Sequence, residues 1–320
     1  MPTFWLTLED GTQRRIGRGG LVLGRRHDCD IVLDEPGISR QHALLRETAS
    51  GAELIVLGRT PTWLDDTLVT EPRDVPEGAT LRLGTRRLSV SARSTAGSAA
   101  GSWSLQVEGG TRIGLPGTTR VGGGAQDDVV IPDWPSGAAV LHPLPATLVV
   151  ELGAAGEVSG RPHEAGALLS LPPGAILRFA GRGAVVACGD GGMDTTAVAS
   201  AAPLPIDVAL HFHERGGLLH LRFPDSRGSV YLPDRRCDLV AALLRPTGEA
   251  PGTFVPDALL AARIWPGDPS KGRVDLNTLL MRARRTLLDA GFDGPALLPR
   301  AEGGGATRFV FAPGARVTVE

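Results

Sequence analysis

The sequence is poor in the residues that chemical sites usually need. Its three cysteines are far apart and form no Cys-x-x-Cys pair, which argues against a disulfide framework and against a zinc site. Aromatic residues make up only 4% of the chain, and a single lysine, Lys271, stands among many arginines. The chain also lacks a nucleophile elbow, a metalloprotease helix, the kinase loops and a P-loop. We therefore expect no enzyme, no cofactor and no metal site.

Long apolar runs are missing as well. No stretch reaches the length of a membrane-spanning helix, and the N-terminus alternates like a strand rather than resembling a signal peptide. These absences predict a cytoplasmic protein that makes no membrane contact. Residues 206–320 carry a small excess of basic over acidic side chains, within a chain of net charge -2. That excess is too small to indicate nucleic-acid binding from charge alone.

Turn-forming residues, by contrast, are abundant, with 43 glycines and 25 prolines. They separate short alternating apolar runs over residues 1–93, a pattern typical of an all-β sandwich. A small-residue linker at 93–102 ends this segment, residues 103–189 repeat its layout, and a second linker covers 189–205. Residues 206–320 differ, because they mix strands with helical periodicity. We expect three domains with these boundaries, two of them all-β and the last α+β.

Two colinear matches indicate an internal duplication. The first copy contains a glycine, an aspartate and an apolar triplet at Gly24, Asp30 and residues 31–33. The same residue types recur 98 positions later, at Gly122, Asp128 and residues 129–131. Near the end of each copy, residues 77–83 match residues 173–179 at an offset of 96. Colinear repetition of this kind predicts the same fold twice.

The first copy carries a cluster of arginines and small polar residues in its turns. The cluster comprises Gly24-Arg25, Ser39-Arg40-Gln41-His42, Leu57-Gly58-Arg59-Thr60, Gly78 and Gly84. This pattern resembles the forkhead-associated (FHA) domain, a β-sandwich whose loops at one end bind phosphothreonine peptides. The resemblance covers about residues 4–92. It implies that Arg25 and Ser39 hold the phosphate, with Arg40 beside it, and that Gly24 and His42 order the loops.

The chemistry of these residue types is consistent with that implication. A phosphate dianion offers three acceptor oxygens and is matched better by the planar fork of arginine than by lysine. In one respect the chain departs from the family, because Thr60-Pro61 stands where an Asn-Gly pair is usual. Thr60 is left as the expected peptide contact at that position, with one hydroxyl, whereas Pro61 has no backbone donor.

The second copy has lost the charged residues of this cluster. Arg25 is replaced by Gly123, and the Ser-Arg-Gln-His segment aligns with residues 136–139, in a loop one residue shorter. Both arginines and the histidine are absent there. We therefore expect a degenerate FHA-like sandwich that does not bind phosphothreonine and serves as a spacer or a protein-contact surface.

The last segment predicts three strands followed by three helices and a closing hairpin. The helices are expected at 234–245, 255–265 and about 270–290, with Asp234 as an N-cap, Pro256 at a first helical position and Gly291 as a stop. The hairpin is expected from the Gly-rich turn between 297 and 311. The region from about 230 to 315 resembles the winged-helix effector domain of OmpR/PhoB-type regulators.

The third of these helices is the expected recognition helix. Five apolar positions share one face and should pack on the domain: Leu276, Leu279, Leu280, Ala283 and Leu287. The resemblance implies that the outward residues and the wing contact DNA, and the candidates are Lys271, Arg273, Asn277, Thr278, Arg282, Arg285 and Arg308. Met281 in the middle of the outward face fits a protein contact better. A protein-binding winged helix therefore stays open as the alternative.

Taken together, these features predict a phosphothreonine-dependent signalling protein that regulates transcription through its C-terminal domain. The expected partners are a phosphothreonine-containing protein, the Ser/Thr kinase that modifies it, DNA, and a second copy of the chain. The alternative is an adaptor in a Ser/Thr kinase pathway whose domains all bind protein. His211, His213 and His220 lie on neighbouring strands, but without nearby cysteines or carboxylates they do not predict a metal site.

Overall fold

The computed structural model describes residues 2–27, 29–48, 51–94, 103–108, 112–115, 117–189, 203–268 and 270–320. The chain forms two compact units: residues 1–96 and 204–320 belong to one, and residues 97–203 to the other. Most of the two expected linkers lies outside the described residues. Within the described ranges, no helix is both long enough and apolar enough to cross a membrane.

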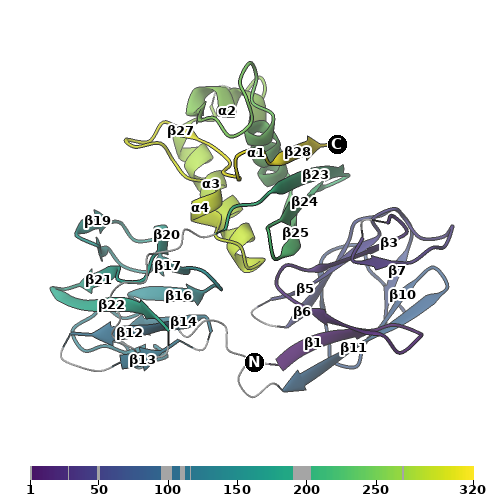
Figure 1. Cartoon of the computed structure of the whole chain (residues 1–320), viewed down its shortest axis with the longest axis horizontal. Helices are drawn as coiled ribbons and strands as arrows, with labels where there is room; N and C mark the ends of the chain where they lie inside the picture. The colour runs from purple at the N-terminus through teal and green to yellow at the C-terminus, as the bar shows by residue number, and fades with distance from the viewer. Residues whose placement is uncertain are drawn as a thin grey trace. The chain divides into compact units, whose positions relative to one another are not determined.

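Residues 2–94 fold into a sandwich of two β-sheets, which we call the first sandwich (Figure 1). Its strands are β1 (Pro2–Thr7), β2 (Gln13–Ile16), β3 (Leu21–Gly24), β4 (Ile31–Val32), β5 (Ala43–Glu47), β6 (Ala52–Val56), β7 (Thr62–Leu64), β8 (Thr67–Leu68), β9 (Arg73–Val75), β10 (Thr80–Leu83) and β11 (Arg86–Ser94). One sheet has the order β2-β1-β11-β10-β7-β8 and the other β4-β3-β5-β6-β9. Inward-facing residues such as Leu6, Leu45 and Leu81 are fully buried between the sheets.

Residues 103–189 form the second sandwich. Its strands are β12 (Trp103–Val107), β13 (Arg112–Gly114), β14 (Thr119–Gly122), β15 (Val129–Val130), β16 (Ala139–Pro143), β17 (Leu148–Leu152), β18 (Gly156–Val158), β19 (Arg161–His163), β20 (Leu168–Leu171), β21 (Ile176–Phe179) and β22 (Arg182–Cys188). The sheet orders are β13-β12-β22-β21-β18-β19 and β15-β14-β16-β17-β20. Every strand takes the place of one strand of the first sandwich, so the duplication seen in the sequence extends to the topology.

The repeated aspartate explains part of this common topology. The backbone amide of Val22 donates to Asp30 Oδ2 at 2.9 Å, and the amide of Arg120 donates to Asp128 Oδ2 at 2.8 Å. In each sandwich the carboxylate ties the loop after the third strand back to that strand. The aspartate therefore belongs to the fold and not to a ligand site, which is why both copies keep it.

The length of the loop before the fifth strand differs between the two sandwiches by more than was expected from the sequence. The strand pairs that fix the register are Leu23–Ala43 in the first sandwich and Val121–Ala139 in the second. The offset therefore falls from 98 to 96 across the loop, which is two residues shorter in the second copy and not one. With this correction, Pro135 takes the place of Ser39, and Ser136 takes the place of Arg40.

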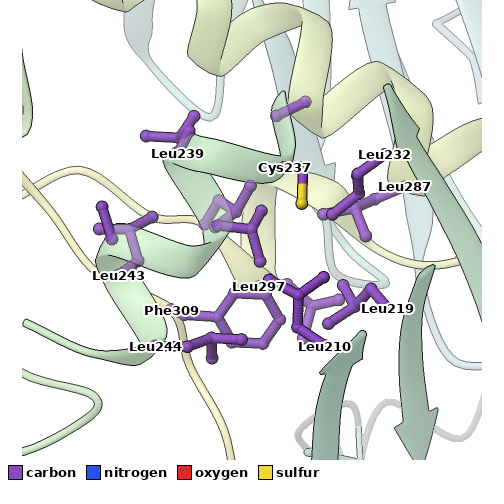
Figure 2. Close-up of a cluster of buried hydrophobic side chains, with 14 of the residues drawn as sticks. Leu210, Leu219, Leu232, Cys237, Leu239, Leu243, Leu244, Leu287, Leu297 and Phe309 are labelled. Carbon is purple, nitrogen blue, oxygen red and sulfur yellow. The ribbon is translucent and has the colours of Figure 1, made fainter. Parts of the chain in front are cut away.

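Residues 204–320, which we call the C-terminal part, combine a four-stranded sheet with helices. The strands are β23 (Asp207–His213), β24 (Gly216–Arg222), β25 (Arg227–Pro233), β26 (Val255–Pro256), β27 (Ala306–Thr307) and β28 (Arg316–Val319), and the helices are α1 (Arg235–Leu244), α2 (Asp257–Ile264), α3 (Arg273–Asp289) and α4 (Gly294–Leu297). The sheet has the order β25-β24-β23-β28. Leucines of the sheet and helices surround Phe309 in the core, as Figure 2 shows. The expected strands and helices are present, whereas membership of the winged-helix family stays a prediction.

Several local expectations for this part need correction. The closing hairpin is present, because the backbone amides of Ala301, Arg308 and Val310 donate to the carbonyl oxygens of Ala306, Pro299 and Leu297, around the antiparallel bridge between Arg300 and Thr307. In addition, β27 pairs with β26, and β28 joins β23 in parallel. Asp234 occupies the N-cap position of α1, but its side chain makes no capping hydrogen bond. Pro256 is the N-cap of α2 and not its first helical residue. Gly291 follows the end of α3 with φ of 85°, as expected for a helix stop.

The first sandwich and the C-terminal part share an apolar contact within their common unit. We call it the interdomain cluster, and its residues are Val22, Cys29, Leu44, Ile55, Leu57 and Leu218, with Tyr231 packed against them. Leu218 comes from β24, and the other five buried residues come from the first sandwich. The amide of Ser229 also donates to the carbonyl oxygen of Gly19 at 2.6 Å. A buried cluster of this kind joins the two parts by the hydrophobic effect.

Candidate functional site

Two hydroxyl groups meet in the loops at one end of the first sandwich. Ser39 lies in the loop before β5, and Thr60 lies in the loop between β6 and β7. Ser39 Oγ and Thr60 Oγ1 are 3.0 Å apart, and both residues are half-buried. A hydroxyl donates one hydrogen and accepts through two lone pairs. One bond between the two groups therefore leaves one hydroxyl hydrogen available to a ligand.

The loops can approach this closely because two positions lack a side chain. A Cβ atom on Gly58 would lie 2.3 Å from Ser39 Oγ, and one on Gly24 would lie 2.3 Å from the carbonyl oxygen of Arg40. Both distances are far below van der Waals contact. A loop-ordering role was expected for Gly24 but not for Gly58. Its place in the FHA-like pattern, two residues before Thr60, was the sequence signal for such a role.

His42 holds the backbone of Ser39 in place through a hydrogen bond. The amide of Ser39 donates to His42 Nδ1 at 3.1 Å. Nδ1 is therefore the acceptor, and Nε2 carries the hydrogen that it donates to Thr62 Oγ1 at 3.0 Å. Burial lowers the pKa of His42 to about 4, so the ring is neutral near pH 7. This geometry fits the loop-ordering role expected for His42, and it adds Thr62, which the sequence analysis had not singled out.

Arg25 and Arg40 place two exposed guanidinium groups on the same loops. The amide of Arg25 donates to the carbonyl oxygen of Ser39 at 3.1 Å, so the backbone holds Arg25 beside the serine. Among the described residues, neither guanidinium has a hydrogen bond or an ion pair with the protein. The site thus combines two unpaired cations with two hydroxyl groups. Such a set can bind a multiply charged anion that offers several oxygen acceptors.

The second sandwich fills the corresponding loops with its own carboxylate. Asp127 Oδ2 accepts from the amides of Gly124 at 2.8 Å and Gly137 at 3.0 Å, and Oδ1 accepts from Arg120 Nε at 2.9 Å. The Asp127 side chain has no exposed surface. These hydrogen bonds, that to Gly137 above all, lower the pKa of Asp127. The amides of Gly124 and Gly137 and the Nε group of Arg120 are therefore occupied by the protein itself.

The inward face of α3 is as expected, and its outward face is more neutral than expected. All five residues predicted to pack on the domain are buried. Most cations of the predicted DNA-binding face are paired with carboxylates: Lys271 Nζ with Asp275 at 3.0 Å, Arg273 Nε with Asp257 at 4.0 Å and Arg285 Nε with Asp289 at 3.2 Å. Val274 and Met281 add apolar surface, at 79% and 41% exposure.

The remaining DNA-binding candidates are three exposed residues of α3 and Arg308. Asn277, Thr278 and Arg282 are exposed on α3, and Thr278 Oγ1 donates to the carbonyl oxygen of Val274 at 3.0 Å. Arg308 lies over the ring of Phe254 with its Cζ atom 4.6 Å from the ring centroid. That stacking holds the guanidinium against the protein surface.

The histidines of the C-terminal part take structural roles. Gln41 Nε2 donates to His220 Nε2 at 2.9 Å, and His220 Nδ1 bonds Ser229 Oγ at 2.8 Å. His211 lies 3.4 Å from a carboxylate oxygen of Glu320. Across the described ranges, no group of three or more histidine, cysteine and acidic side chains is arranged to hold a metal ion.

Comparison with known proteins matches one part of the chain. The model of the FHA domain family matches residues 21–84. A curated relative, the FHA domain-containing protein PS1 of Arabidopsis thaliana, is 43% identical over 70 residues. That match covers 20% of this chain and only 5% of the relative.

Part of the chain is similar to several solved structures. One of them comes from a structural and functional analysis of phosphothreonine-dependent FHA domain interactions. It is 25% identical, covers 29% of this chain and 99% of its own, and has a TM-score of 0.28. Another is Mycobacterium tuberculosis EmbR in complex with a low-affinity phosphopeptide, at 21% identity and a TM-score of 0.28, covering 30% of this chain and 26% of its own.

Proposed function

We propose that the first sandwich binds phosphothreonine in a partner protein and that the chain acts in signalling downstream of a Ser/Thr kinase. One observation carries this proposal. The hydroxyls of Ser39 and Thr60 lie 3.0 Å apart, beside the unpaired guanidinium groups of Arg25 and Arg40, in a domain that matches the FHA family model. The proposed function is binding without catalysis.

The charges of this set match those of the ligand. A phosphothreonine carries about -1.5 to -2 charges near pH 7 and three strong acceptor oxygens. Two arginines neutralise that charge, and each can donate two parallel hydrogen bonds. Ser39 supplies a neutral donor that Gly58 and His42 hold in place. An unmodified threonine offers none of the charge, so binding should depend on phosphorylation.

The partner side of the proposal follows the same chemistry. A kinase working in the cytoplasm would create the ligand, on another protein or on a second copy of this chain. In the latter case phosphorylation would drive self-association, and two linked copies would gain avidity for a shared target. The second sandwich, with Asp127 occupying its loop donors, would serve as a degenerate FHA-like spacer or protein-contact surface.

The test is binding of the full chain to a phosphothreonine peptide library and to the same library without phosphate. Arg25→Ala and Ser39→Ala should each weaken binding by about tenfold to a hundredfold, since a charge-assisted hydrogen bond contributes roughly 1.5–3 kcal/mol. Arg15→Ala is the matched control, because Arg15 is exposed on β2 outside these loops. Equal binding of phosphorylated and unphosphorylated peptides would contradict the proposal.

For the C-terminal part we infer protein binding, the alternative kept from the sequence, in preference to DNA binding and transcription regulation. Lys271 and Arg285 are each paired with a carboxylate four residues further along the chain, and Val274 and Met281 are exposed beside them. A surface that reads DNA has to offer free cations to phosphates. Interfaces between proteins favour methionine and avoid lysine and acidic residues at their centres.

Salt-dependent DNA binding tests this inference. We expect the full chain to show no shift of genomic DNA fragments at low salt, and Met281→Asp to weaken capture of protein partners. DNA binding that falls steeply with salt, and that is weakened by Arg282→Ala with Arg285→Ala, would restore the regulator hypothesis. Leu259→Asp on α2 is the control for an exposed apolar residue on another helix, since Leu259 is 57% exposed.

A further inference from the structure

The three loops that form the proposed phosphate site also touch the C-terminal part. Each loop contributes one polar contact: Asp30 with Arg227 at 2.8 Å, Gln41 with His220 at 2.9 Å and Arg59 with Glu214 at 2.8 Å. The interdomain cluster lies beneath them, with Cys29 and Leu57 at the ends of two of these loops. The rim of the site is therefore built by both parts of the unit.

Glu214 lies in the turn between β23 and β24, and that turn is held against the peptide-binding loops. Neighbouring His213 is half-buried and lies against the backbone of Leu57, three residues before Thr60. On the other side of Glu214, Tyr231 Oη donates to the carbonyl oxygen of Arg215 at 2.8 Å. Both anchors fix the backbone of the turn, so the carboxylate of Glu214 stays close to the β6–β7 loop.

The ion pair that Glu214 makes is open to exchange. Its Oε1 is 2.8 Å from Arg59 Nε, with the Glu214 side chain 68% exposed and that of Arg59 86% exposed. Exposed pairs of this kind contribute little to stability and are easily replaced. Arg59 directly precedes Thr60. A ligand residue next to the phosphothreonine can therefore take the place of Arg59 as the partner of Glu214.

The negative charge of Glu214 determines which peptide residues are favoured beside the phosphothreonine. The loops present Arg25, Arg40 and Arg59, so by themselves they would attract any acidic sequence around the phosphate. A carboxylate at the rim lowers the local potential, which penalises aspartate and glutamate and rewards lysine and arginine. A two-part site can thus discriminate among phosphopeptides that the loops alone would bind alike.

We propose that Glu214 makes the phosphopeptide site composite, selecting phosphothreonine sequences with basic residues beside the phosphothreonine. This inference rests on the proposed function of the first sandwich. Arg25, Ser39 and Arg40 capture the phosphate, and the C-terminal part sets which phosphorylated partner is accepted. Glu214 acts as a specificity-determining residue with no part in phosphate capture.

The test uses the full chain and two fluorescent phosphothreonine peptides that differ only in their flanks, one with lysines and one with glutamates. The wild type should prefer the lysine peptide. Glu214→Lys should shift the ratio of the two affinities by about thirtyfold toward the glutamate peptide at low salt, the size that Coulomb's law gives in water for charges about 8 Å apart when each side changes by two units. Glu214→Gln should shift it about half as far on a logarithmic scale, and high salt should shrink both effects.

Glu77→Lys is the matched control. Glu77 is exposed in the turn between β9 and β10, at the opposite end of the sandwich from the site, and its reversal changes the net charge equally. An affinity ratio that moves equally in Glu214→Lys and Glu77→Lys overturns the composite site while leaving phosphate recognition intact. Binding that does not depend on phosphate in any variant overturns the proposed function, and the composite site with it.

Discussion

At the scale of single residues, the position of Ser39 depends on neighbours that are not themselves ligands. Gly58 leaves room for its hydroxyl, and the neutral ring of His42 accepts from its amide. A charged His42 would lose that acceptor, because a protonated imidazole carries hydrogens on both nitrogens. The site therefore requires a histidine that resists protonation, and burial provides it.

His42 gives a pH-dependent prediction. Its pKa in the folded protein is about 4, against 6.5 for an unperturbed histidine. Above pH 6.5 both folded and unfolded states hold the ring neutral; between pH 6.5 and 4 only the unfolded state takes up the proton. The folding stability that depends on neutral His42 is therefore complete above pH 6.5 and is lost as the pH falls toward 4.

The measurement is the pH slope of the unfolding free energy of the unit that contains the first sandwich. Between pH 6.5 and 4, His42→Gln should reduce the pH dependence of the unfolding free energy by an amount that corresponds to the uptake of up to one proton. The variant itself is expected to be less stable than the wild type. His27→Gln is the comparison for the loss of a histidine from an exposed position in the same loop region. An identical slope in His42→Gln and the wild type would contradict the prediction.

At the scale of elements, the two sandwiches differ in the loop before the fifth strand. This loop belongs to the candidate site in the first sandwich, whereas in the second sandwich it is shorter and is bonded to Asp127. The second sandwich has two residues fewer before β16, and Gly122 and Gly124 leave room for the carboxylate of Asp127 against the loop backbone. The buried carboxylate satisfies two backbone amides and Arg120. The same topology thus supports an open, cationic set of loops in one copy and a self-bonded set in the other.

Asp127→Asn should destabilise the second sandwich by about 2–4 kcal/mol, because an amide presents hydrogens where the carboxylate accepted from backbone amides and a guanidinium. The pKa of Asp127 is lowered in the folded state, so its contribution is present at neutral pH and is lost as the pH falls through that lowered pKa. Urea unfolding followed by the buried Trp103 and Trp134 reports on this unit. Glu157→Gln, on the exposed surface of β18, is the control and should change the midpoint little.

At the scale of the whole molecule, the interdomain cluster couples the first sandwich to a segment more than a hundred residues away in sequence. Leu218 is fully buried and contributes the side chain of the C-terminal part to that cluster. The second sandwich, although it lies between these segments in the sequence, belongs to the other unit. Unfolding should therefore follow the units and not the order of the domains.

Leu218→Ala should lower the unfolding free energy of the unit formed by residues 1–96 and 204–320 by about 2–4 kcal/mol, through lost burial and the cavity left behind. The transition of the second sandwich should not move. Leu259→Ala removes the same atoms from an exposed position on α2 and should have little effect. If the unfolding of the first sandwich is the same in Leu218→Ala as in the wild type, the cluster does not couple the two parts.

Much of the fold is readable from the sequence because it depends on local patterns. Alternating residues and frequent turns predicted both sandwiches, and the spacing of Leu276, Leu280 and Leu287 predicted the buried face of α3. The comparison of the two copies separated Asp30, which serves the fold, from Arg25, which the second copy lacks. The closing hairpin was also predicted correctly, whereas the pairing of β27 with β26 and of β28 with β23 was not foreseen, because those partners are distant in sequence.

The sequence by itself determined the two β-sandwiches and the cluster of arginine, serine and histidine in one set of loops, since pattern and motif spacing are properties of the chain. Only the tertiary structure decided which charges stay free. It paired Arg285 with Asp289 and Arg273 with Asp257, closed the second copy over Asp127, and brought Glu214 to Arg59. Electrostatic contacts depend on distances between groups that the sequence leaves undetermined, so the surface chemistry follows from packing and not from composition.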